Sequence, residues 1–108
     1  MEEIKIDNLR LMIQKQDYDT ILTNFKKRVF KILYLKDDYM TDKIKEYDVI
    51  SYINALSWDL YGAYKVFNNY KFLNCICELE GIKENVKSEF VRKKVLDLGS
   101  YISLIKEG

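Results

Sequence analysis

The chain has 108 residues, of which 48% are hydrophobic and 14% aromatic, and its 18 basic residues nearly balance its 17 acidic residues. This composition predicts one compact domain over residues 1–108, because chains that stay disordered have few apolar residues and a large net charge. The sequence contains no histidine, which excludes Ser-His-Asp and Cys-His catalytic sites and a conventional zinc site.

Neither a membrane helix nor a signal peptide is evident in the sequence. Its apolar runs fall short of the ~18 residues that a membrane helix needs, and the N-terminus lacks the basic flank and apolar stretch of a signal peptide. We therefore expect a cytoplasmic protein without a membrane partner. Residue types with AT-rich codons dominate the chain, which indicates an AT-rich genome such as that of a low-GC bacterium, a phage or a mobile element.

Helical periodicity predicts an all-α, compact bundle of about five helices. The first is expected over residues 7–16, with Asp7 as its N-cap. The second is expected over residues 18–36. Its apolar positions form one face and comprise Ile21, Leu22, Phe25, Val29, Ile32 and Leu33. The apolar face of the first helix would lie on the opposite side of a continuous helix, so a break is predicted near residues 17–19.

The third and longest helix is predicted over residues 42–67, after a polar loop at residues 36–40. Thr41 or Asp42 is the expected N-cap. Its buried stripe has the spacing of successive helical turns and comprises Val49, Ile53, Leu56, Leu60, Ala63 and Phe67. Asn68 and Asn69 mark the end of this helix, because asparagine tolerates left-handed backbone.

The fourth helix is predicted over residues 70–80 and the fifth over residues 84–106. In the fourth, Phe72, Cys75, Ile76 and Leu79 face inward, and Gly81 fits the position that follows the C-cap. The fifth has a regular apolar seam of Val91, Val95, Leu98, Ile102 and Ile105. This spacing is typical of a helical bundle and equally of a seam between two chains, so a homodimer is one alternative.

The two cysteines, Cys75 and Cys77, are two positions apart. On a helix such residues point in widely different directions, which is unsuitable for a disulfide. Two further metal ligands are also missing, so no metal site is predicted. We expect both thiols to be buried as small apolar fillers in a reducing compartment.

The third helix carries a second stripe that its core does not need. On the side roughly opposite Leu56 and Leu60, this stripe consists of Tyr47, Asn54, Trp58, Tyr61 and Lys65. Two interpretations are open: the helix is central and covered on both sides, or the stripe is an exposed partner-binding surface. Trp and Tyr are enriched at binding hot spots, which favours a protein partner or a second copy of the chain in the second interpretation.

A basic stripe on the second helix provides an alternative function. It consists of Lys26, Lys27, Phe30, Lys31 and Tyr34, which would offer phosphates a positive surface and bases an aromatic one. A solvated helix face explains the same pattern. The net charge of +1 is far from the strongly basic balance of dedicated nucleic-acid binders.

The acidic residues indicate structural roles. Asp37, Asp38, Asp42, Glu46 and Asp48 gather around the start of the third helix, where they complement its dipole or meet a basic partner. Their order does not match a calcium-binding loop. Asp59, if buried, is expected to accept a hydrogen bond from a Tyr or Lys and not to act in catalysis, since it lacks a second catalytic group.

These patterns predict a non-catalytic protein-binding module, without cofactor or metal, that acts by occupying a partner's surface. By analogy of size and composition, small helical proteins of AT-rich mobile elements are often inhibitors, immunity proteins or anti-defence proteins. A nucleic-acid-binding accessory or regulatory protein is the alternative, with the basic stripe as its contact surface.

Overall fold

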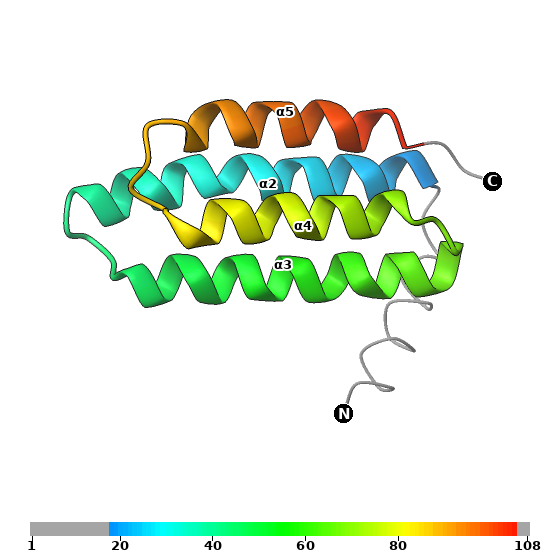
Figure 1. Ribbon diagram of the computed structural model, residues 1–108, viewed down its shortest axis with the longest axis horizontal. Coiled ribbons are helices and arrows are strands. Elements are labelled where there is room, and N and C mark those ends of the chain that lie inside the picture. The colour runs from blue at the N-terminus through cyan, green and yellow to red at the C-terminus, as the bar shows by residue number, and fades with distance from the viewer. Residues whose placement is uncertain (1–17, 106–108) are drawn as a thin grey trace.

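The computed structural model describes residues 18–105, which form an all-α bundle of four helices (Figure 1). The helices are α2 (Tyr18–Met40), α3 (Glu46–Phe67), α4 (Lys71–Glu84) and α5 (Val91–Ser103). This confirms the predicted fold class, with four helices in the described residues where about five were expected for the whole chain. The helix predicted over residues 7–16 lies outside the described residues, as does Asp17 in the predicted break.

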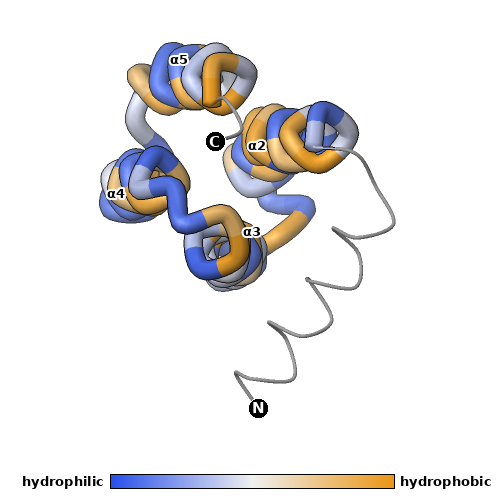
Figure 2. Tube along the Cα trace, turned by 90° about the vertical axis from the view of Figure 1, so that its right-hand side faces the viewer, coloured by the Kyte–Doolittle hydropathy of each residue, from blue (hydrophilic) through white to orange (hydrophobic). Residues whose placement is uncertain are grey.

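The helices run alternately up and down, and consecutive helices are neighbours (Figure 1). Helix α5 also packs against α2, so that every helix has two neighbours. Seen end-on, the four helices occupy the corners of a square, with α2 and α4 on one diagonal (Figure 2). Short connections dictate this arrangement, since they force consecutive helices to lie antiparallel.

The core is built from the stripes that the spacing of apolar residues predicts. All five predicted seam residues are buried, including Ile105, which lies just beyond the end of α5. Phe72, Cys75 and Leu79 of α4 are buried too. The predicted core residues of α2 and α3 are also buried, apart from Leu33 and Phe67, which are partly buried like Ile76 of α4. The core extends beyond the prediction to Ile82 and Val86.

The boundary between α2 and α3 differs from the prediction. Residues 36–40 are helical and not a loop, because Leu35 and Tyr39 pack against the core and hold the last turns of α2 in place. The chain then turns at Asp42, whose φ of 61° is left-handed. Neither Thr41 nor Asp42 therefore caps α3. Its N-cap is Lys45, whose backbone N–H donates to Asp48 Oδ2 at 2.9 Å.

The later boundaries show one confirmed prediction and two errors. Asn68 ends α3 in left-handed conformation, with a φ of 53°, and its N–H donates to the Tyr64 carbonyl. Helix α4 continues through Gly81 to Glu84, because the buried Ile82 prolongs its apolar stripe. Helix α5 begins only at Val91, after a turn over residues 85–90.

Helices α2 and α5 approach closely where Phe30 lies over Gly99. A Cβ atom on residue 99 would sit 2.7 Å from the Phe30 ring, which is closer than van der Waals contact permits. Glycine at this buried position therefore makes room for the ring. Phe30 is partly buried and packs against the core, so its ring is not a free stacking platform on the surface of α2.

The two cysteines have different environments. Cys75 is buried and Cys77 is exposed, and both are free thiols. The prediction of two buried thiols is thus wrong for Cys77, because a residue two positions from the core stripe points away from it.

We expect iodoacetamide to modify Cys77 in the native protein and to reach Cys75 only when the protein unfolds. The thiolate is the reactive form, and burial raises the pKa of Cys75 to about 12. Mass spectrometry after brief labelling at pH 8 measures the two sites separately. A Cys77→Ser variant should take up no label until denaturant is added, and rapid labelling of Cys75 without denaturant would contradict its burial.

Candidate functional site

The second stripe of α3 divides into two parts in the structure. Trp58 and Tyr61 stack on each other, with ring centroids 6.0 Å apart and an interplanar angle of 16°. The Trp58 side chain is 36% exposed, while Tyr61 is partly buried. Tyr47 is 75% exposed but lies eleven residues before Trp58, about 16 Å away along the helix. The structure therefore does not join Tyr47 to the Trp58–Tyr61 stack.

Lys65 extends the stack toward the C-terminal end of α3. Its ammonium lies 5.4 Å from the Tyr61 ring centroid and 5.7 Å from that of Tyr64. These distances are within the range of cation–π attraction. Tyr61 and Tyr64 are themselves in contact, with centroids 6.0 Å apart. An exposed cation thus stands beside an aromatic surface that continues from Trp58.

Trp58 and Tyr61 border a groove of about 370 Å³ between α3 and α4. Asn54 and Ser57 of α3 line the same groove, and α4 contributes Ile76 and Glu80. The groove is mainly apolar, because the two aromatic rings and Ile76 form most of its wall. The sequence predicted three of the four α3 residues of this groove but not Ser57, and it predicted neither Ile76 nor Glu80 of α4 as part of it. Ser57 precedes Trp58, and Ile76 lies at the edge of the α4 stripe, but neither signal indicates a shared groove.

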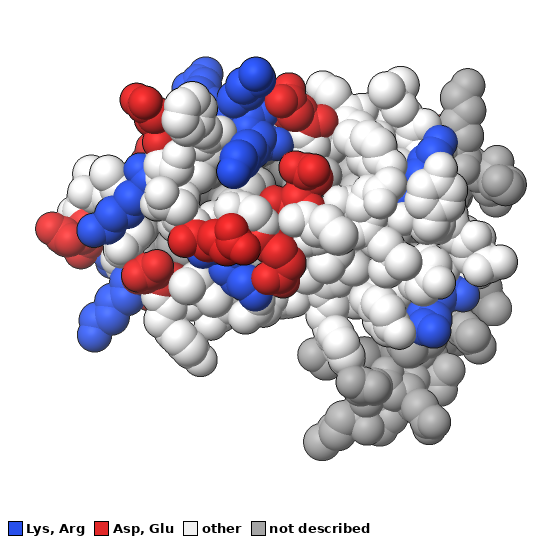
Figure 3. Space-filling view, viewed as in Figure 1, with Lys and Arg blue, Asp and Glu red and all other residues white. Residues whose placement is uncertain are grey.

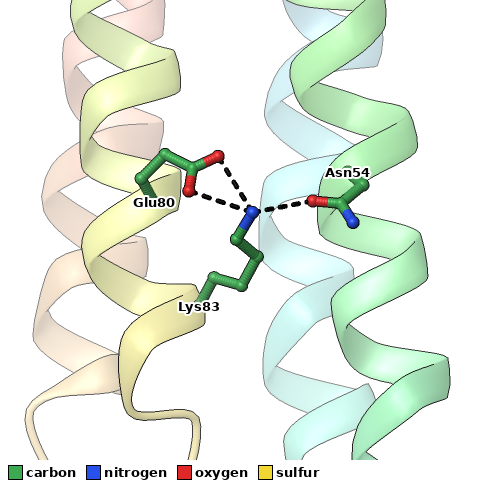
Figure 4. Close-up of polar contacts among 3 residues, drawn as sticks. All are labelled: Asn54, Glu80 and Lys83. Carbon is green, nitrogen blue, oxygen red and sulfur yellow. Dashed lines mark hydrogen bonds and ion pairs between the residues drawn. The ribbon is translucent and has the colours of Figure 1, made fainter.

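A side-chain hydrogen bond joins α4 to α3 at this groove (Figure 4). Lys83 Nζ donates to Asn54 Oδ1 at 2.9 Å and forms an ion pair with Glu80 Oε2 at 2.9 Å. Its position three residues after Glu80 is a helical pairing that sequence could suggest. Asn54 could not be paired with it from the sequence, because the contact spans two helices.

Ser57 adds a hydroxyl with unused hydrogen-bonding capacity. Its Oγ atom is buried and has no hydrogen-bond partner among residues 18–105. A buried hydroxyl without a partner is costly.

A second groove, of about 470 Å³, lies on the other side of α4, against α5. Asn74, Cys77 and Glu78 of α4 line it together with Asp97, Leu98 and Tyr101 of α5. Here too a polar contact joins the helices, since Asn74 Nδ2 donates to Tyr101 Oη at 2.9 Å. Helix α4 is therefore flanked by two grooves, each bordered by an aromatic side chain.

The basic stripe of α2 is only partly free. Lys26 lies over the Phe30 ring at 5.8 Å, and Phe30 is packed against α5. Lys31 lies 5.7 Å from the ring of Tyr52 on α3. Lys27, Lys31 and Tyr34 remain exposed on the outer face of the helix. The predicted combination of cations and stacking rings is thus reduced to two lysines and one tyrosine.

Asp59 is partly exposed and pairs with an arginine, in place of the Tyr or Lys that was expected had it been buried. Its Oδ2 atom lies 2.8 Å from Arg28 Nη2, which links α3 to α2. Tyr52 Oη donates to the Arg28 carbonyl at 2.8 Å in the same contact. Among residues 18–105, no group of three or more His, Cys, Asp or Glu side chains is placed to hold a metal ion.

Comparison of the chain with protein-family models, with curated proteins and with solved structures finds no match. No helix within residues 18–105 has the length and apolar character required to cross a membrane. A function therefore has to be inferred from the chemistry of the two grooves and of the exposed helix faces.

Proposed function

We propose that this chain is a non-catalytic protein-binding module whose contact surface is the groove between α3 and α4. The observation that carries the proposal is the Trp58–Tyr61 stack at the border of this groove. Stacked rings are rigid, so they bury a large area on binding at a small entropic cost. Trp and Tyr are also the residue types that most often dominate binding energy.

The polar groups of the groove favour binding over catalysis. The Glu80 carboxylate pairs with Lys83. Ser57 has no hydrogen bond to a general base among the described residues, and the chain has no histidine to supply one. Such a module would act by covering a partner's surface, as inhibitors, immunity proteins and anti-defence proteins do.

Nucleic-acid binding is the second candidate, and one observation favours it. Tyr34 is 72% exposed on the outer face of α2, and Lys27 and Lys31 are exposed on the same helix. If these residues bind phosphates, the protein is retained on heparin at about 50 mM salt, and retention is lost in the double variant Lys27→Gln/Lys31→Gln.

The proposed protein contact is tested by affinity capture from the source cell with the native chain and with Trp58→Ala. A partner that binds this groove should be recovered with the native chain and reduced about 10-fold or more with the variant, as expected for a hot-spot residue. Tyr34→Ala is the matched control, because it removes another exposed aromatic ring from a different helix. Circular dichroism establishes that both variants are folded at the temperature of the assay.

Two results would contradict this proposal. One is equal recovery of every partner by the native chain and by folded Trp58→Ala. The other is a partner that is lost with Tyr34→Ala and retained with Trp58→Ala, which would move the contact to α2.

A further inference from the structure

Every charged residue among the exposed residues of α4 is acidic. The exposed residues are Asn74, Cys77, Glu78, Glu80 and Glu84, and they include no cation. The two lysines of this helix, Lys71 and Lys83, are only partly exposed, and Lys83 is paired with Glu80. In the view of Figure 3, acidic side chains gather near the middle of the face that α4 presents. The net charge of the whole chain is +1, so this acidity is local.

The carboxylates of this face stand at the borders of the two grooves. Glu80 lines the groove between α3 and α4, and Glu78 and Asp97 line the groove between α4 and α5. Neither groove is lined by a lysine or an arginine. The groove between α3 and α4 therefore combines an aromatic wall with a carboxylate that is paired with Lys83. The groove between α4 and α5 has two carboxylates at its border, and neither forms an ion pair among residues 18–105. A ligand that fits both features has apolar side chains next to cationic ones.

The length of α4 sets the size of such a ligand. The helix has 14 residues, which corresponds to a length of about 21 Å. A helical segment of similar length could lie along α4 and direct apolar side chains into both grooves. Its lysines or arginines would then be placed near Glu78, Glu80 and Asp97.

A second copy of this chain fits this surface poorly. Its exposed cations on α2, Lys27 and Lys31, lie diagonally across the bundle from α4 (Figure 2). Three more exposed cations, Arg92, Lys93 and Lys94, lie in the first turn of α5, the helix that forms one wall of the second groove. A contact between α2 of one copy and α4 of the next uses two different surfaces. Such a contact propagates into an open chain unless its rotation closes a ring. The cations of α2 therefore favour a different protein as the partner, and sedimentation tests self-association through the cations of α5.

We infer that the partner contacts α4 through a cationic amphipathic segment that occupies both grooves. This inference rests on the proposed protein-binding function and specifies the chemistry of the partner. Apolar side chains of the segment pack against Trp58 and Tyr61 on one side and against Leu98 and Tyr101 on the other. Its cations pair with the carboxylates at the groove borders, so binding weakens as salt concentration rises.

The inference is tested with three synthetic 14-residue peptides on the native chain. The first is a Leu/Lys amphipathic helix, the second replaces each Lys by Glu, and the third replaces each Leu by Ser. Trp58 is the only tryptophan, so its fluorescence reports on the groove between α3 and α4. The rate of Cys77 alkylation reports on the groove between α4 and α5. We expect the Leu/Lys peptide to change both signals, more weakly at 500 mM than at 50 mM salt, and the other two peptides to change neither.

Two triple variants separate local charge from net charge. Glu78→Gln/Glu80→Gln/Asp97→Asn should weaken binding of the Leu/Lys peptide about 10-fold, as expected for the loss of three exposed ion pairs. The control Asp37→Asn/Asp42→Asn/Glu46→Gln removes the same charge from exposed positions of α2, α3 and the turn between them. It should bind like the native chain.

The outcomes that would overturn the inference are distinct from those that would overturn protein binding. Equal or tighter binding of the Leu/Glu peptide, no binding of the Leu/Lys peptide, or equal loss in both triple variants shows that the partner is not a cationic amphipathic segment. Equal binding of the Ser/Lys peptide shows that the grooves take no part. Self-association in sedimentation that depends on Glu78, Glu80 and Asp97 identifies a second copy as the occupant. If the peptide or triple-variant results overturn the inference, a partner captured through Trp58 would still support the proposed function.

Discussion

Replacing Phe72 by alanine is expected to lower the free energy of unfolding by about 3–5 kcal/mol. Phe72 is among the largest fully buried side chains of the described residues. Its ring stacks on Phe67 with centroids 5.9 Å apart and lies 6.3 Å from that of Phe25. The variant therefore removes apolar contacts between α4 and two other helices, and the rigid surroundings would fill the resulting cavity only in part.

Urea unfolding followed by far-ultraviolet circular dichroism measures this loss. Phe90→Ala is the matched control, because Phe90 is 62% exposed at the start of α5. The control should change the free energy of unfolding by about 0.5 kcal/mol or less. If the two variants proved equally stable, the ring of Phe72 could not lie in the core.

Leu60→Ala is expected to lower the free energy of unfolding by about 2–5 kcal/mol. Leu60 of α3 is fully buried in the core, and its removal would leave a cavity there. It is two residues from Trp58 but faces the core, so the variant tests the assignment of the two sides of α3.

The control for this variant is Leu104→Ala. Leu104 follows α5 and is 67% exposed, so its truncation should be nearly neutral. The same urea titration, fitted with a common m-value, gives both free energies. A loss below about 1 kcal/mol for Leu60→Ala would mean that the assigned core side of α3 is wrong.

The core could be predicted from the sequence because burial repeats with the helical turn. The five seam residues Val91, Val95, Leu98, Ile102 and Ile105 are spaced by four and three positions, and all five are buried. A periodic pattern of this kind depends only on which side of a helix faces its neighbours. Asn68 was predictable for a local reason too, since few residues other than glycine tolerate its backbone conformation.

The helix boundaries required information from other parts of the chain. Residues 36–40 have the polar composition of a loop, but Tyr39 packs against the core and the helix continues. Asp42 and Thr41 are good N-cap residues, but the chain reverses there, and α3 begins only after Lys45. Tertiary packing decides such cases, and local preference is too weak to oppose it.

Only the α3 side of the candidate site could be predicted from the sequence. The three-residue spacing of Trp58 and Tyr61 places them on one side of a helix, and they are in contact in the structure. The α4 side of the groove depends on how two helices are rotated against each other, which no spacing within one helix determines. For the same reason, the sequence did not show that Phe30 is held over Gly99.

The up-and-down connectivity has a consequence for how the chain folds. Three of the four main helix contacts join consecutive helices, and only the contact between α5 and α2 joins the ends of the described bundle. That contact is also the most extensive of the four, and pairing of distant parts of the chain slows folding relative to local contacts. The entropic cost of closing a long loop arises in one step, the docking of α5 onto α2. In that step the ring of Phe30 packs over Gly99.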